Sequence, residues 1–214
     1  MVRDFWVGMA VLALSSAASA QDRRPRIDVE HYMIEAEINP QEQSLAAKAR
    51  VRFVPQEDIT AAVFELNNAL NVSRVEDAEG RPVSAARSHQ DFSERLNFSE
   101  RLAKGTPVTV VFHYDGRLTG GEESPVFGIK FAAIHAEHSF LLYPARWFPL
   151  SGYSTDRFTA ELTITVPAGH KVLAPGFETK AEAPAGKSAF SFRFTNPSFP
   201  GSLAVVREEP ARAP

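Results

Sequence analysis

The sequence predicts an all-β protein, built as a β-sandwich or as a large curved sheet. Several segments alternate strictly between apolar and polar residues, and turn residues separate these segments at short, fairly even intervals. A length of 214 residues suits one all-β domain, and 44% hydrophobic residues suffice for a sizeable core. The net charge of −3 gives no basic field for nucleic acid, and the absence of cysteine excludes disulfides and thiolate metal sites.

The first twenty residues have the pattern of a secretory signal peptide. Arg3 supplies a charged start, residues 5–14 form an apolar run, and Ala18-Ser19-Ala20 is a small-residue cleavage pattern. The apolar run is too short for a stable membrane span, which needs about 20 residues. We therefore expect residues 1–20 to be removed and the protein to be exported, to a periplasm or to the outside, with Gln21 as its first residue.

Residues 21–206 then form the predicted β domain. The alternation is clearest in four segments, at residues 34–38, 108–114, 158–166 and 190–194. A helix would distribute these apolar residues all round its axis, whereas a strand places them on one face. Counting the turn signals between such segments predicts about ten to thirteen strands.

Residues 88–102 and residues 207–214 lack the clear alternation of the other segments. Residues 88–102 carry a short duplication, in which the five residues 92–96 recur unchanged at 98–102. We expect a strand and a turn there rather than a helix. Residues 207–214 have lost the apolar periodicity and are expected to form a linker-like tail.

A search for chemistry singles out the segment His135-Ala136-Glu137-His138. A zinc-protease helix needs the spacing H-E-x-x-H, which brings two imidazoles to one face beside the general base. Here the spacing is H-x-E-H, and a strand would place His135 and Glu137 on one face and His138 on the other. A solvated strand edge is the favoured interpretation, with a weak metal or partner contact through His135, Glu137 and His138 as the alternative.

The aromatic residues Tyr143, Trp147, Phe148 and Tyr153 allow two interpretations. They could form a platform on which sugar rings stack, or they could fill a core or an interface, which is the commoner use of such residues. No nucleophile with an adjacent base and no phosphate-binding loop is recognisable. The residues alone thus indicate an exported β domain without a visible active site.

The order of the segments adds a resemblance to a known family. It rests on residues 31–40 followed by 45–53 and 62–66, on residues 105–118, on Ala145-Arg146-Trp147-Phe148-Pro149 followed by 158–176, and on residues 192–204. In this order they resemble the N-terminal, saddle-shaped β domain of aminopeptidase N-like zinc metallopeptidases, the gluzincin group that includes leukotriene hydrolase. The resemblance implies a large curved antiparallel sheet or β-sandwich of that saddle type.

The resemblance also implies what the chain does not do by itself. In this family, catalysis belongs to a following domain with a Gly-x-Met-Glu-Asn loop and an H-E-x-x-H motif, and neither motif occurs here. We therefore expect a non-catalytic chain, truncated relative to the family, that holds no cofactor of its own. Its expected partner is a separately encoded metallopeptidase catalytic domain, which would bind the zinc and the peptides and whose peptide-binding cavity this chain would help to wall.

By the same resemblance, the loops around residues 127–140 and 146–153 would contact the catalytic domain. The residues expected there, or at the wall of the substrate cavity, are Glu137, Tyr143, Arg146, Trp147, Phe148 and Tyr153, and Trp147 would be partly exposed without a partner. The alternative function is an independent periplasmic binding module for glycan or peptide, which would use the aromatic rings of Tyr143, Trp147 and Tyr153.

Overall fold

The computed structural model describes residues 24–121, 126, 128–151 and 156–207. The described part contains one short 3-10 helix, η1 (Pro144–Arg146), and fourteen strands, slightly more than the sequence predicts. The strands are β1 (Ile27–Asn39), β2 (Ser44–Pro55), β3 (Ile59–Glu65), β4 (Leu70–Asp77), β5 (Ser84–Ser88), β6 (Ser93–Leu102), β7 (Val108–Arg117), β8 (Ala132–Ile134), β9 (His138–Leu141), β10 (Phe158–Pro167), β11 (Lys171–Leu173), β12 (Phe177–Ala181), β13 (Lys187–Ser198) and β14 (Leu203–Val206). Across these residues, no helix has the length and apolar character needed to cross a membrane.

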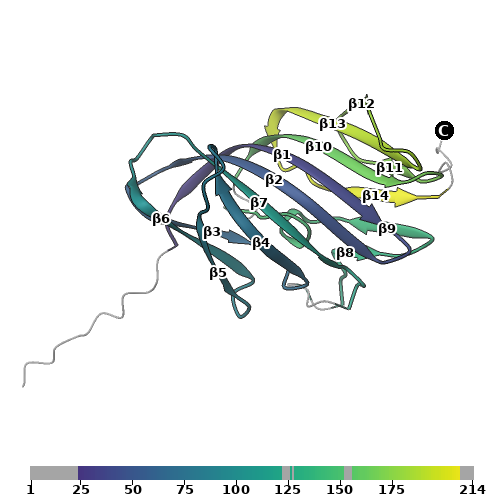
Figure 1. Cartoon of the computed structure of the whole chain (residues 1–214), viewed down its shortest axis with the longest axis horizontal. Coiled ribbons are helices and arrows are strands. Elements are labelled where there is room, and N and C mark those ends of the chain that lie inside the picture. Colours follow the sequence, from purple (N-terminus) through teal and green to yellow (C-terminus); the bar gives the residue numbers. More distant parts are fainter. Residues whose placement is uncertain (1–23, 122–125, 127, 152–155, 208–214) are drawn as a thin grey trace, which may run out of the picture.

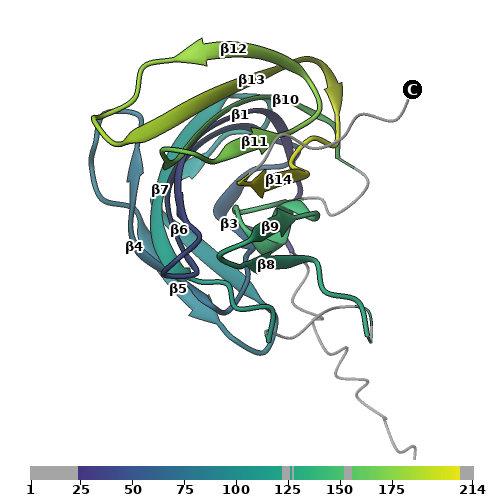
Figure 2. The same ribbon diagram turned by 90° about the vertical axis from the view of Figure 1, so that its right-hand side faces the viewer.

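The strands form one large curved sheet and two small ones (Figure 1). The large sheet has seven strands in the order β12-β13-β10-β1-β2-β7-β4, and the small sheets have the orders β3-β6-β5 and β11-β14-β9-β8. Figure 2 shows the four-stranded sheet lying inside the curve of the large one. The predicted all-β class is confirmed, with one refinement, because β1 and β10 pair in parallel while the other strand pairs are antiparallel.

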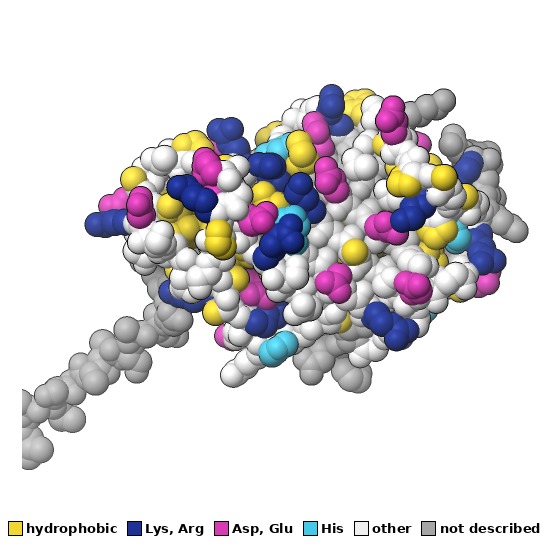
Figure 3. Space-filling view, in the orientation of Figure 1, with side chains coloured by type: hydrophobic (Ala, Val, Ile, Leu, Met, Phe, Trp, Pro, Cys, Tyr) yellow, Lys and Arg dark blue, Asp and Glu magenta, His cyan; other side chains and the backbone are white. Residues whose placement is uncertain are grey.

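Alternation of burial along the central strands explains this layering. In β1 the side chains of Tyr32, Ile34 and Ile38 are buried, whereas Glu35 and Glu37 between them are exposed. In β10 every second residue from Phe158 to Val166 is buried, as the sequence predicts. The inner face of the large sheet therefore forms the core, and its outer face is polar, with charges of both signs interspersed (Figure 3).

The predicted face of β13 is only partly buried. Phe192 lies in the core, but Phe190 and Phe194 remain half-exposed because β13 has only the short strand β12 between it and the sheet edge. In contrast, the prediction of strand and turn for residues 88–102 is confirmed. β5 ends at Ser88, Phe92 adopts a left-handed φ of +51°, and β6 begins at Ser93.

Candidate functional site

The hairpin of β8 and β9 holds the His135-to-His138 segment in its turn. The structure places His135, Ala136 and Glu137 between the strands, and His138 begins β9. The arrangement that a strand would give, with His135 and Glu137 on one face, does not apply, because the chain reverses here. Glu137 is exposed at the tip, and the rings of His135 and His138 lie 5.9 Å apart between centroids.

The His135 ring takes part in a hydrogen bond that fixes this turn. The side-chain nitrogen of Gln43 donates to the carbonyl oxygen of Ile134 at 3.1 Å and to Nδ1 of His135 at 3.3 Å. Since an amide nitrogen only donates, Nδ1 of His135 is the acceptor and its proton lies on Nε2. Among the residues that the structure describes, no three His, Cys, Asp or Glu side chains are grouped as a metal ion would require.

The opposite end of the same hairpin is apolar and exposed. Val126 is 44% exposed, Ile129 is 49% exposed, and Leu142, which directly follows β9, is also 49% exposed. The amide of Leu142 donates to the carbonyl of Phe131 at 2.8 Å, which joins the segments before β8 and after β9. Of the six large hydrophobic side chains exposed in the described part of the chain, three belong to the segments that flank β8 and β9. We call Val126, Ile129 and Leu142 the apolar end of the hairpin.

The segment after the hairpin turns inward instead of forming a surface. Trp147 is fully buried, Phe148 is nearly so, and the indole Nε1 of Trp147 donates to the carbonyl oxygen of Gly201 at 2.7 Å. The expectation that Trp147 would be partly exposed is therefore wrong, since the loop before β14 covers it. A fully buried ring has no face on which a sugar could stack, so a glycan platform centred on Trp147 loses its support.

Tyr143 and Tyr153 complete the aromatic set that the sequence singles out. Tyr143 is half-buried, and the centroid of its ring lies 5.8 Å from that of Phe131 and 5.9 Å from that of Phe199. Tyr153 lies outside the described residues.

Arg146 is anchored inside the domain by a buried ion pair. Its guanidinium is paired with the carboxylate of Glu65 at the end of β3 and lies 5.4 Å from the ring centroid of Phe92. Glu65 and Leu150 also exchange two backbone hydrogen bonds, of 2.7 and 2.9 Å. These contacts connect residues 146–150 to β3, so the Arg146–Glu65 ion pair holds together two segments that are distant in sequence. We call this ion pair the clamp.

A cavity of about 600 Å³ lies beside this clamp and is lined by Arg26, Glu65, Leu150 and Asp156 among others. The half-buried carboxylate of Asp156 accepts hydrogen bonds from the amides of Val29 at 3.0 Å and Arg157 at 2.9 Å. Burial raises the pKa of Asp156, and the nearby Asp28 raises it further, against the two amides, which lower it. The sequence offers no signal for Asp156, because the hydrogen bond from Val29 joins it to β1, 127 residues away.

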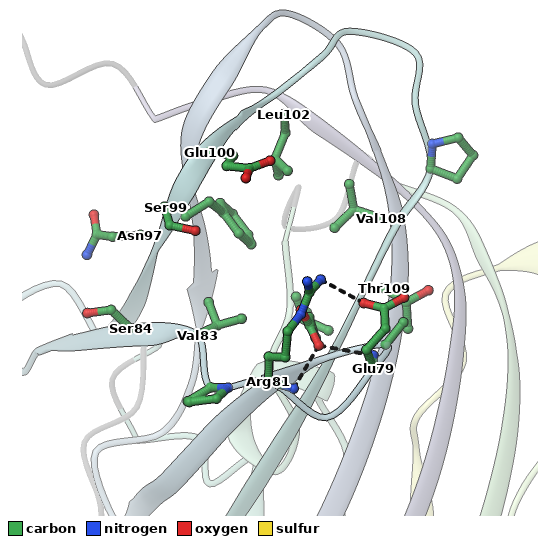
Figure 4. Close-up of a pocket in the computed structure, with 16 residues that line it drawn as sticks. Glu79, Arg81, Val83, Ser84, Asn97, Ser99, Glu100, Leu102, Val108 and Thr109 are labelled. Carbon is green, nitrogen blue, oxygen red and sulfur yellow. Dashed lines mark hydrogen bonds and ion pairs between the residues drawn. The ribbon is translucent and has the colours of Figure 1, made fainter.

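A second cavity, of about 720 Å³, lies between β6 and β7 (Figure 4). Half-buried apolar side chains from Val83, Phe98, Leu102 and Val108 line it, together with the turn after β4. In that turn, Arg81 is paired with both Asp77 and Glu79. Sequence reasoning missed this cavity, because it arises where two consecutive strands separate into different sheets.

Comparison with known proteins identifies the fold. No protein-family model matches the chain, and no curated protein matches it significantly. Among solved structures, an M1 zinc metallopeptidase from Deinococcus radiodurans is similar with a TM-score of 0.74 and 23% identity, over 86% of this chain and 43% of that one. A variant M1 zinc metallopeptidase from the same organism, bound to a Tyr-Ser-Ala substrate, is similar with a TM-score of 0.73 and 21% identity, over 84% of this chain and 42% of that one.

The chain therefore spans less than half the length of these relatives. At this level of identity the likeness concerns the fold, and it confirms the predicted fold of the N-terminal β domain of such peptidases.

Proposed function

We propose that this chain is a non-catalytic β domain that packs against the zinc-binding catalytic domain of an aminopeptidase N-like metallopeptidase. In that assembly it helps to wall the peptide-binding cavity, and the zinc and its chemistry belong to the catalytic domain. The shared fold supports the first part of this proposal, because the matched relatives have more than half of their length beyond the part that is similar to this chain.

The observation that carries the proposal is the apolar end of the hairpin. Burying large apolar side chains that are nearly half exposed is favourable, and three of them in the segments that flank one hairpin make this end a candidate interaction surface. Ile129 and Leu142 lie in or next to the segment that the family resemblance implies as the contact surface. The proposed contact is therefore this end of the β8–β9 hairpin, while residues 146–150 support it from inside.

Glu137 lies at the other end of the hairpin from the apolar end, and we propose a different role for it. It is exposed at the tip of the hairpin, where its carboxylate is available to a group outside the domain. We assign it to the wall of the peptide cavity, as an acceptor for the positively charged amine of a bound peptide.

Capture of the partner tests the interface. Tagged residues 21–214 are immobilised and exposed to an extract of the organism that encodes the chain, and retained aminopeptidase activity is measured with aminoacyl fluorogenic substrates. We expect the native chain to retain chelator-sensitive activity, and mass spectrometry to identify a protein with an H-E-x-x-H motif. The double variant Ile129→Asp/Leu142→Asp should retain at least about tenfold less.

A matched control separates the interface from general surface hydrophobicity. Phe177 at the start of β12 is 71% exposed, and Phe177→Asp should retain as much activity as the native chain. Equal retention by the double variant, or chelator-sensitive turnover by the purified chain alone with added zinc, would overturn the proposal.

A further inference from the structure

The cavity between β6 and β7 has features that the proposed function does not use. The strands β5 and β6, which contribute to its lining, lie toward the end of the molecule opposite the β8–β9 hairpin (Figure 1). The volume of the cavity, about 720 Å³, is within the range of ligand-binding pockets, roughly 300–1,000 Å³. Its lining combines an apolar floor with a charged rim, which is the usual composition of a binding site.

The strand that borders the cavity has backbone groups available for pairing. β5 pairs with β6 only from Ser93 to Asn97, and the ladder between β3 and β6 jumps from the pair Ala61–Asn97 to the pair Ile59–Leu102. Within the described residues, neither ladder assigns a partner to Phe98–Arg101. This stretch is therefore an extended bulge whose N–H and C=O groups can accept another strand.

The facing strand is also incomplete on its cavity side. β7 pairs with β2 from Val108 onward, but its ladder with β4 ends at the pair Asp77–Val110. Val108 and Thr109 thus extend past the end of β4 and line the cavity. Two partly paired strands on either side of one cavity define a slot for an extended chain.

The side chains indicate what kind of chain fits. Val83, Phe98, Leu102 and Val108 are half-buried and packed against the core, so an apolar side chain placed on them would complete their burial. At the rim, the carboxylates of Asp77, Glu79 and Glu100 outnumber the guanidinium of Arg81. Figure 4 shows Arg81 held by the turn after β4, with Glu100 on the opposite side of the cavity. The excess of negative charge favours a basic ligand.

We propose that this slot binds an extended peptide with alternating basic and apolar residues, which adds as a strand along Phe98–Arg101. The backbone of the peptide pairs with the bulged part of β6. Its apolar side chains enter the floor formed by Val83, Phe98 and Leu102, and its basic side chains face Glu100 and Glu79. This site is independent of the interface in the proposed function, so either can fail without the other.

Amide chemical shifts of the isotope-labelled chain, residues 21–214, test the site directly. The probe is an acetylated and amidated peptide of alternating lysine and valine, titrated at low ionic strength. We expect saturable shifts at residues 98–102 and 108–110. Shifts that fall elsewhere, or shifts in this region that depend on protein concentration without peptide, would overturn the assignment, the latter by showing that two copies pair with each other.

Two altered peptides separate strand addition from simple charge attraction. A peptide with glutamate in place of lysine should bind at least about tenfold more weakly, because its charges oppose Glu79 and Glu100. A lysine–valine peptide with N-methylated valines keeps every charge but loses backbone donors, and should also bind at least about tenfold more weakly. Equal binding of the N-methylated peptide would exclude strand addition.

Variants of the protein complete the test. Glu100→Lys should weaken binding about three- to tenfold, whereas Glu35→Lys makes the same change of charge on the outer face of β1 and should leave binding unchanged. Val83→Asp places a charge in the floor and should abolish the shifts. Unaltered binding by Glu100→Lys and Val83→Asp, in variants whose circular dichroism matches the native chain, would contradict the proposal.

Discussion

The indole Nε1 of Trp147 donates a hydrogen bond of 2.7 Å to the carbonyl oxygen of Gly201, which connects the segment after η1 to the loop before β14. Both partners are buried. The ring of Phe148 packs at 90° against the indole and also borders Gly201. One tryptophan thus links two of the segments that close the inner layer of the domain.

Gly201→Ala should destabilise the domain strongly. Gly201 has a left-handed φ of +127°, and a Cβ there would lie 2.7 Å from Cε1 of Phe148. Backbone strain and overpacking together predict a loss of about 2–4 kcal/mol of unfolding free energy, measured by urea denaturation. Gly169→Ala is the control, because Gly169 also has a positive φ but a Cβ there would meet open space, so its loss should be about 1 kcal/mol. Equal losses for the two variants would contradict the tight packing at Gly201.

Trp147 also provides a spectroscopic test of the buried core. The sequence contains two tryptophans, and Trp147 is the single one in residues 21–214. We expect blue-shifted fluorescence, little quenching by iodide, and a red shift on unfolding in urea, because the folded domain excludes water from the indole. Strong quenching in the folded state would show that Trp147 is a surface residue, as the family resemblance implied.

The difference at Trp147 illustrates what the sequence could and could not predict. The strands of β1 and β10 follow from a period of two, because the pattern that makes them strands also places their apolar residues in the core. Burial of Trp147 depends instead on a loop 54 residues away, and no local pattern reports that contact. The same limit applies to the parallel pairing of β1 with β10 and to the slot between β6 and β7. Each depends on how distant strands are arranged, whereas period and turn chemistry are local properties.

Breaking the ion pair of Arg146 and Glu65 should cost more unfolding free energy than breaking an exposed pair on the outer sheet face. Both side chains are largely buried, so Arg146→Met leaves the Glu65 carboxylate without its charge partner, and we expect a loss of about 3–5 kcal/mol in unfolding free energy. Arg193→Met removes one partner of an exposed pair with Glu161 and should change the stability very little.

A double variant distinguishes the cost of an unpaired charge from lost packing. In Arg146→Met/Glu65→Gln the unpaired carboxylate is gone, so part of the loss should be recovered. Urea denaturation of the four chains forms a complete cycle. Strictly additive losses would mean that the two side chains are not energetically coupled.

Asp156 should make the domain less stable as pH rises from mildly acidic to neutral. Burial raises its folded-state pKa above the ordinary value of 3.8, so the folded chain holds the proton more tightly than the unfolded chain does. The unfolding free energy contributed by this group is therefore highest below the ordinary pKa, and it falls as pH passes through the raised value. Asp156→Asn has no such titration, so its stability relative to the native chain should increase between about pH 4 and pH 7.

Urea denaturation at several pH values measures this difference. Glu35→Gln, at an exposed carboxylate on the outer face of β1, is the matched control and should track the native chain at every pH. A difference between Asp156→Asn and the native chain that stays constant with pH would rule out the buried carboxyl as its cause.

Replacing Leu141 or its neighbour Leu142 by alanine should change the free energy of unfolding by very different amounts. Leu141 is fully buried in β9 and faces the core, whereas Leu142 is 49% exposed at the apolar end of the hairpin. Leu141→Ala should cost about 2–5 kcal/mol of unfolding free energy, because it leaves a cavity in the core. Leu142→Ala should change the free energy of unfolding by no more than about 0.5 kcal/mol, because its side chain already contacts water.

The pair also connects stability with the proposed interface. Leu142→Asp in an otherwise stable domain should reduce retention of a catalytic domain, and this separates recognition from folding in the capture experiment. A neutral effect of Leu142→Ala on stability would leave this side chain free to contact a partner, so that reduced retention by Leu142→Asp reports recognition. A large loss of stability on Leu142→Ala would instead place this side chain in the core and remove the reason for an interface there.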